Sequence, residues 1–251
     1  YSNPYWLKSV HNEGFFTVTD PMLILQPENS AAYSVKINLN IEGLNLEINK
    51  PLVYKSVDPA KGEVYRPFEV LPAIAVNFSA KAFTFQNGKP AGIQLNIIAN
   101  EDSVKGKVIL NLPKGWKAEP AEFNLEIFSK NNNRIFETTI TPPTTHSEGT
   151  ISAMVISNGD SISYGIKRME YDHIPYQFML NEAKAKLVSA DIKLAGTNIG
   201  YIPGAGDEVA ECLAQIGYNV TILSDELLSK INLNGFDAIV TGIRAYNTND
   251  W

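Results

Sequence analysis

The sequence has few of the residues that metal and thiol chemistry require. Its 251 residues include one cysteine, Cys212, and three histidines, His11, His146 and His173. A single cysteine cannot form an intrachain disulfide, and no histidine, cysteine or carboxylate residues have the spacing of a zinc site. We therefore expect neither a metal nor a cofactor. Cys212 falls inside a helical pattern, where we expect a small buried thiol rather than a nucleophile.

A basic excess and long apolar runs are also missing. The net charge is −6 and the pI is about 5.2, which argues against nucleic-acid binding because such proteins present a basic surface. No run of about 18 apolar residues occurs, so we expect no membrane span. The N-terminal segment lacks the basic and apolar regions of a signal peptide. Because the chain starts without methionine, we interpret it as an internal fragment of a longer protein.

Short alternating segments, separated by turn residues, dominate the first two thirds of the chain. Tyr33–Ile41 and Leu44–Ile48 alternate apolar and polar side chains around a Glu-Gly turn, which predicts a hairpin of half-buried strands. The same alternation recurs further on, for example in Ile93–Ala99. We predict two β-sandwiches of the immunoglobulin type, over residues 1–72 and 73–170.

Residues 171–251 have a different pattern, which predicts a connector and an incomplete α/β unit. An apolar strand over Ile199–Ile202 leads into a glycine turn and a helix that ends at Gly217. Further strands are predicted over Asn219–Leu223 and Phe236–Thr241. Strand–helix–strand repeats of this size indicate a parallel sheet. The fold class is therefore mainly β followed by α/β.

The turn after the first parallel strand resembles a phosphate-binding loop only in part. Gly204 and Gly206 fit the dinucleotide fingerprint, but Val209 stands where its third glycine belongs. Asp207 and Glu208 place negative charge at the helix start, which repels a phosphate. We therefore favour a tight turn in which Asp207 caps the helix.

Polar residues at the carboxyl ends of two parallel strands form a candidate ligand site, since open α/β sheets bind ligands at that edge. The candidates are Gly204, Gly206, Asp207, Arg244, Tyr246 and Asn247. Arg244 can hold an anion there. The alternative is an internal pair between Arg244 and Asp207 that only ties the two loops together.

Aromatic residues beside turns form a second set of candidates. Tyr5, Trp6, Trp116 and Tyr176 can each stack on a sugar ring, and we select Trp6 and Trp116 as the carbohydrate-stacking residues. The alternative is that an aromatic residue near a proline turn plugs the edge of a sandwich.

The histidines are weaker candidates. Asp172 can orient the imidazole of His173, although a lone histidine in a connector more often bonds a backbone carbonyl. We expect His146 and His11 to lie in solvated loops.

Four short motifs together resemble a known family. They are Leu112–Trp116 with Pro120, Tyr171–Pro175, Gly200–Asp207 and Gly242–Asn247. With these motifs, nearly the whole chain is similar to the region downstream of the catalytic domain in Bacteroidota proteins of the PIG-L (LmbE-like) deacetylase family. In that family a zinc-dependent domain removes N-acetyl groups from amino sugars. Sandwich domains follow it, and then an α/β domain similar to class I glutamine amidotransferases.

The resemblance implies association with a deacetylase rather than deacetylase chemistry within this chain. The family's zinc motif, a His-Pro-Asp-Asp run with a distant histidine, is absent from the sequence. An amidotransferase-like domain would need a cysteine nucleophile in the turn Thr241–Tyr246, which has none. The resemblance also implies a flavodoxin- or amidotransferase-like α/β unit. The resemblance further implies that Asn181–Ser189 continues as a strand into the sheet, whereas the residue pattern alone predicts a short helix there.

Three functions stay open at this point. The first is a non-catalytic accessory region that positions or binds a glycan or amino sugar, with the upstream catalytic domain of the same polypeptide as a partner. The second is small-molecule binding or hydrolase activity at a rim formed by Gly206 and Arg244. The third is a structural spacer. The resemblance implies a periplasmic or secreted location and leaves the cytoplasm open.

Overall fold

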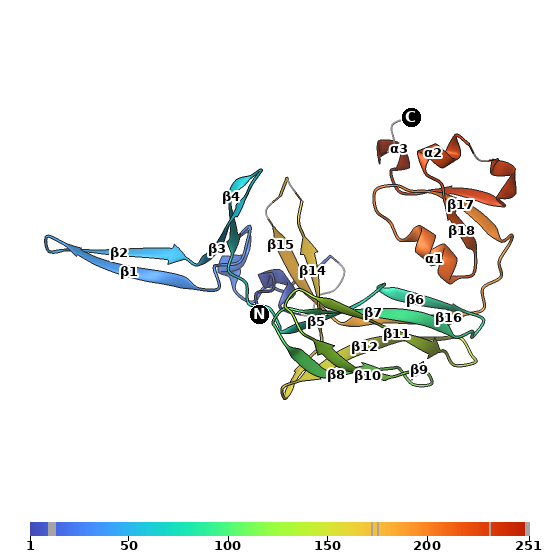
Figure 1. Cartoon of the computed structure of the whole chain (residues 1–251), viewed down its shortest axis with the longest axis horizontal. Helices are drawn as coiled ribbons and strands as arrows, with labels where there is room; N and C mark the ends of the chain where they lie inside the picture. The colour runs from blue at the N-terminus through green and yellow to red at the C-terminus, as the bar shows by residue number, and fades with distance from the viewer. Residues whose placement is uncertain (10–13, 172, 175, 231, 249–251) are drawn as a thin grey trace.

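The computed structural model describes residues 1–9, 14–171, 173–174, 176–230 and 232–248. The architecture is mostly β, with several separate sheets. Figure 1 shows a β-sandwich between two smaller parts, the N-terminal hairpins on one side and a C-terminal α/β part on the other.

The sandwich consists of two sheets. The larger sheet contains, in spatial order, β10 (Glu122–Ile127), β8 (Val104–Asn111), β12 (Ser147–Ser157), β16 (Lys184–Ala190) and β6 (Ala82–Gln86), with β13 (Asp160–Ile162) paired to β12. The smaller sheet contains β5 (Ile74–Phe78), β7 (Ala91–Ala99), β11 (Asn133–Thr141) and β9 (Lys117–Glu119). Neighbouring strands are antiparallel except β16 and β6, which are parallel.

One hydrophobic core lies between the two sheets. Leu95 and Ile97 of the smaller sheet and Val108 and Val155 of the larger sheet are fully buried in the same cluster. Each alternates with more exposed neighbours, as a strand with one core-facing side requires. Complete burial of such a side chain stabilises the fold by roughly 1.5–3 kcal/mol.

The sandwich extends beyond the predicted boundary at residue 170. Lys184–Ala190 is strand β16 within the larger sheet, so the short helix predicted over Asn181–Ser189 is not formed. The reason is a period of two in this segment, because Ala185 and Leu187 are buried while Lys184 and Lys186 are exposed. The strand continuation implied by the family resemblance is the one observed.

Residues 1–72 do not form the sandwich that was predicted for them. The described strands of this range form two separate two-stranded antiparallel sheets, β1 (Ser34–Ile41) with β2 (Leu44–Pro51) and β3 (Val53–Asp58) with β4 (Gly62–Pro67). Two short 3₁₀ turns, η1 (Tyr5–Leu7) and η2 (Pro21–Leu23), precede them. No described residue before Pro72 is buried, because no second sheet covers either hairpin. The β1–β2 hairpin extends away from the sandwich (Figure 1).

A further hairpin, β14 (Tyr164–Met169) with β15 (Gln177–Glu182), packs on the outer face of the smaller sandwich sheet. The Asn77 side chain bonds both backbone groups of Ile166, as a neighbouring strand would. Its Oδ1 accepts from the Ile166 N–H at 3.1 Å and its Nδ2 donates to the Ile166 carbonyl at 3.2 Å. Asn3 makes the same pair of bonds with Leu180, at 2.9 and 3.1 Å. These two amides attach the hairpin to the sandwich and the N-terminal segment to the hairpin.

The C-terminal part contains a three-stranded parallel sheet in the order β18 (Asn219–Ile222), β17 (Asn198–Ile202) and β19 (Ala238–Thr241). Around it lie α1 (Val209–Gln215), α2 (Asp225–Leu228), η3 (Leu233–Gly235) and α3 (Ala245–Thr248). The central strand is buried from Ile199 to Ile202, whereas the flanking strands are mostly exposed. Cys212 on α1 is exposed, so the prediction of a buried thiol was wrong.

Helix α1 also meets the sandwich. The Thr84 N–H of the edge strand β6 donates to the Gln215 side-chain oxygen at 3.0 Å. Among the described residues, no helix has the length and apolar character needed to cross a bilayer.

Candidate functional site

The loops that follow β17 and β19 meet at one edge of the parallel sheet. The Ala205 N–H donates to the Ile243 carbonyl at 2.8 Å. A Cβ added to Gly204 would lie 2.2 Å from that carbonyl, and one added to Gly242 would lie 2.7 Å from the Gly204 nitrogen. Both glycines are therefore required for backbone-to-backbone contact between the loops.

Asp207 ties these loops together. Its Oδ1 accepts from the Tyr201 hydroxyl and from the Val209 N–H at 3.1 Å, and its Oδ2 accepts from the Ile243 N–H at 2.9 Å. The Tyr201 hydrogen bond, followed by the two backbone bonds, lowers the pKa of Asp207 below its ordinary value. Burial is the main cause that raises the pKa of Tyr201 to about 12.

Arg244 does not pair with Asp207. In the part of the chain that the structure describes, Arg244 is exposed and forms no ion pair, because Asp207 is engaged by main-chain N–H groups. Arg244 has a φ of 55°, in the left-handed region, at the turn from β19 into α3. Tyr246 and Asn247 follow it and are also exposed.

The rim therefore presents the Arg244 cation, but the backbone N–H groups where its two loops meet are not free to bind an anion. The N–H groups of Ala205, Gly206, Gly242 and Ile243 all donate to acceptors within the protein. A bound phosphate would need such donors to be free. The structure joins the two loops through Gly204 and Asp207, and it leaves the predicted rim residues Arg244, Tyr246 and Asn247 exposed.

Trp116 is part of the sandwich core, which corrects its selection as a sugar-stacking residue. It is only 5% exposed. Its indole Nε1 donates to the Ser147 Oγ at 3.1 Å, and its ring meets that of Phe85 edge to face at 5.1 Å between centroids. The alternative weighed for a tryptophan beside a proline turn, a plug at the sandwich edge, is the one observed.

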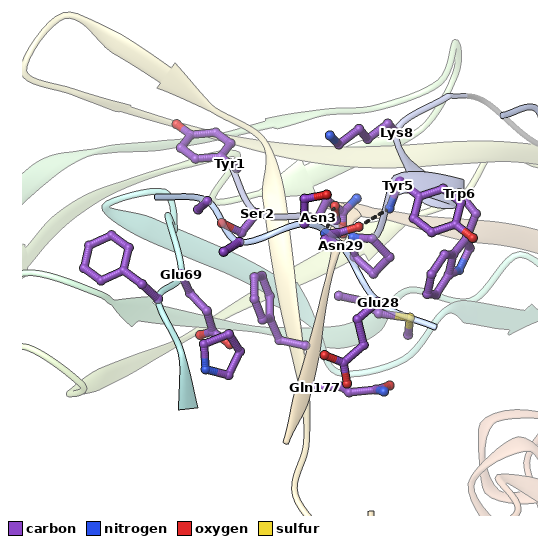
Figure 2. A pocket seen from close by; sticks show the side chains of 18 of the residues that line it. Tyr1, Ser2, Asn3, Tyr5, Trp6, Lys8, Glu28, Asn29, Glu69 and Gln177 are labelled. Carbon is purple, nitrogen blue, oxygen red and sulfur yellow. Dashed lines mark hydrogen bonds between the residues drawn. The ribbon is translucent and has the colours of Figure 1, made fainter. Parts of the chain in front are cut away.

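The other three aromatic candidates come together. Tyr5, Trp6 and Tyr176 line a cavity of about 430 Å³ between the N-terminal segment, the β4 exit and the β14–β15 hairpin. We call it the N-terminal groove; its lining residues are 1–6, 8, 23, 27–32, 67–69, 169 and 176–179. Figure 2 shows Tyr5 and Trp6 at one end of the groove and Glu69 toward the other.

Asparagine side chains shape the aromatic end of the groove. The Asn29 Oδ1 accepts from the Tyr5 N–H and its Nδ2 donates to the Asn3 carbonyl, both at 2.8 Å. The Tyr5 hydroxyl donates to the Gln26 carbonyl at 3.1 Å. The rings of Tyr5 and Trp6 meet edge to face at 4.8 Å between centroids. These bonds hold both rings in place although neither residue is buried.

The charged groups of the groove are mostly acidic. Glu28, Glu69 and Lys8 are the charged side chains in its described lining. Burial raises the pKa of Glu69, and the nearby Arg168 and Arg66 only partly offset this effect. The carboxylate of Glu69 is therefore a half-buried acceptor that a polar ligand can use.

Tyr176 is positioned by a cation. The Arg66 guanidinium lies 4.6 Å from the centre of the Tyr176 ring and also pairs with Glu170. Burial is the main cause that raises the pKa of Tyr176. The sequence pattern did not reveal Glu28, Glu69 and Gln177 as groove residues, because three segments far apart in the chain supply them.

The two described histidines, His146 and His173, do not form a site. His173 is exposed, with its ring 5.7 Å from that of Tyr171, and His146 is exposed in the loop between β11 and β12. His11 and Asp172 lie outside the described residues. Within the described ranges, no cluster of three or more histidine, cysteine or acidic side chains could hold a metal ion.

No protein-family model and no curated protein matches the chain. Native E. coli alpha-2-macroglobulin aligns with a TM-score of 0.33 and 11% identity, over 60% of this chain and 9% of that one. A chain of a type I cohesin–dockerin complex from Clostridium thermocellum aligns with a TM-score of 0.24 and 7% identity, over 47% of this chain and 100% of that one. This chain thus spans about 9% of the length of the alpha-2-macroglobulin chain. At these TM-scores neither likeness assigns a function.

Proposed function

We propose that this chain is a non-catalytic accessory region that binds carbohydrate in the N-terminal groove. The observation that carries the proposal is the convergence of Tyr5, Trp6 and Tyr176 with the carboxylates of Glu28 and Glu69 in one cavity. Its volume of about 430 Å³ is in the range of small-ligand sites, ~300–1,000 Å³.

The lining offers the two kinds of contact that a sugar needs. The apolar face of a pyranose ring can stack on Trp6, which Asn29 and Tyr5 hold in place. Hydroxyl or amino groups of the sugar can donate to Glu69, whose half-buried carboxylate forms no hydrogen bond with any described residue. The resemblance to the region downstream of PIG-L family deacetylases supports a periplasmic or secreted role beside a catalytic domain of the same polypeptide. It also supports a flavodoxin- or amidotransferase-like assignment for the parallel sheet.

The test is a calorimetric titration of the chain with amino sugars, N-acetylated sugars and their oligomers. We expect binding, and we expect Trp6→Ala to weaken it at least about tenfold, which corresponds to ~1.4 kcal/mol. Glu69→Gln, which keeps the shape of the side chain, should also weaken binding.

The matched control is Phe128→Ala, which removes an aromatic ring that is 70% exposed and outside the groove. Equal thermal unfolding temperatures of Trp6→Ala and the control would exclude a folding defect. Binding that Trp6→Ala leaves intact would contradict the groove as its site. The absence of binding to every sugar would favour the structural spacer.

Anion binding at the rim is the second candidate function. One observation favours it: the exposed Arg244 guanidinium lies just past the carboxyl end of β19 and has no ion-pair partner among the described residues. Titration with small carboxylates or phosphate, on the wild type and Arg244→Ala, tests this candidate independently of the groove.

A further inference from the structure

The β1–β2 hairpin has one polar face and one apolar face. Side chains alternate across the hairpin, so residues paired in its register share a face. The odd-numbered residues 33–41 and the even-numbered residues 44–52 form one face, on which nine of ten side chains are apolar and Lys50 is the exception. We call it the hairpin face. Its five cross-strand pairs run from Tyr33 and Leu52 at the base to Ile41 and Leu44 at the tip.

Polar side chains on the opposite face of the hairpin bond one another, so this face needs no partner molecule. Lys36 and Glu47 form an ion pair at 2.7 Å, and the Asn40 amide donates to the Asn45 oxygen at 2.7 Å. These polar side chains bond one another across the strands, as on a face that is exposed to water.

The hairpin face is large for an uncovered surface. Eight of its apolar side chains are 38% or more exposed, with Leu44 at 76%. Taken together, the nine apolar side chains present on the order of 700 Å² to solvent, close to the ~800 Å² that each partner contributes to an interface of standard size. The largest apolar patch of a typical monomer is smaller, ~300–600 Å².

We propose that the hairpin face binds the hairpin face of a second copy of this chain. A twofold axis that runs between the two copies, next to the central pair Ile37 and Ile48 of each, would stack the two hairpins tip to base. Two such ribbons pack face to face about 10 Å apart and form a small four-stranded sandwich between the copies. This arrangement covers in trans the apolar face that the chain leaves uncovered within its own described residues.

Lys50, the one charged side chain of the hairpin face, also fits this arrangement. It pairs with Val35 on the base side of the central pair. The twofold axis therefore places Lys50 of each copy above the Leu39–Leu46 pair of the other, where its long side chain can extend past the apolar side chains to solvent.

The test is sedimentation equilibrium of the whole chain over a range of concentrations. We expect a dimer, and we expect Ile37→Asp to weaken it at least about 100-fold because it buries an unpaired charge at the twofold axis. The matched control is Asn38→Asp, which introduces the same carboxylate one residue away on the polar face and should leave the dimer unchanged.

A second substitution tests the arrangement at Lys50. Lys50→Leu makes the hairpin face wholly apolar and should strengthen the dimer, whereas Glu42→Gln in the turn at the tip should leave it unchanged. Circular dichroism of each variant checks that the strands are retained. A chain that stays monomeric at its highest soluble concentration would overturn the proposal, as would a dimer that Ile37→Asp leaves unaffected.

Discussion

Two segments of the chain have nearly the same sequence and opposite surroundings. Ile37–Ile41 reads Ile-Asn-Leu-Asn-Ile, and Ile93–Ile97 reads Ile-Gln-Leu-Asn-Ile. Both are strands, in β1 and β7. Leu95 is fully buried, whereas Leu39 at the same place in the pattern is 38% exposed.

The difference comes from the sheets around each strand. β7 pairs with β5 and β11, and the larger sheet of the sandwich covers its apolar side. Among the described strands β1 pairs with β2 alone, and no described element covers its apolar side. The same local pattern thus produces a core strand in one place and an open surface in the other.

The largest expected effect is that of Leu95→Ala. It empties space in a close-packed core, so we expect the free energy of unfolding to fall by about 2–5 kcal/mol. Chemical denaturation followed by circular dichroism measures this value. A loss below about 1 kcal/mol would mean that the sandwich core is less tightly packed than its complete burial indicates.

A smaller effect is expected in the α/β part, where a charge rather than an apolar core joins two loops. Asp207→Asn should lower the thermal unfolding temperature at neutral pH, because the carboxylate accepts three hydrogen bonds there. The pKa of Asp207 is lowered in the folded state, so its contribution is present above the ordinary value of 3.8. It is lost as the pH falls through the lower folded-state value.

The difference between wild type and Asp207→Asn should therefore shrink as the pH is lowered from neutral to below 3.8. Differential scanning calorimetry across that range measures it. Glu208→Gln, an exposed neighbour, serves as the control and should show little effect. If the difference in unfolding temperature did not depend on pH, the Asp207 carboxylate would be excluded as the group that stabilises the contact between the two loops.

The smallest effect is expected for Leu39→Ala, the same substitution as Leu95→Ala in the matching segment. For the isolated chain at low concentration, we expect a change below about 0.5 kcal/mol in the free energy of unfolding. If the hairpin face is covered in a dimer, the effect should grow as the protein concentration is raised. A large effect that does not depend on concentration would mean that the hairpin face is already covered within one chain.

The candidate sites were predictable to different degrees. The loops after β17 and β19 were expected to meet because parallel strands end at one edge, and they do. The choice between an Arg244–Asp207 pair and other contacts depended on side-chain geometry, and Asp207 bonds the Ile243 N–H instead. The N-terminal groove was only partly predictable, since Glu69 and Gln177 carry no local pattern and become neighbours of Trp6 through folding.

The sequence by itself determined most strands and turns. The Asn158-Gly159 turn joins β12 and β13 with both residues at positive φ, because asparagine and glycine tolerate that conformation. Local alternation also placed β1, β2 and β7 correctly. These features depend on residues a few positions apart, which a sequence displays directly.

Only the tertiary structure decided which of these surfaces are covered. Trp6 and Trp116 both stand near prolines, yet one lines the groove and the other is buried against Phe85. Leu39 and Leu95 differ in the same way. The physical reason is that alternation creates an apolar side on a strand, while burial of that side requires a second surface from a distant part of the chain or from another molecule.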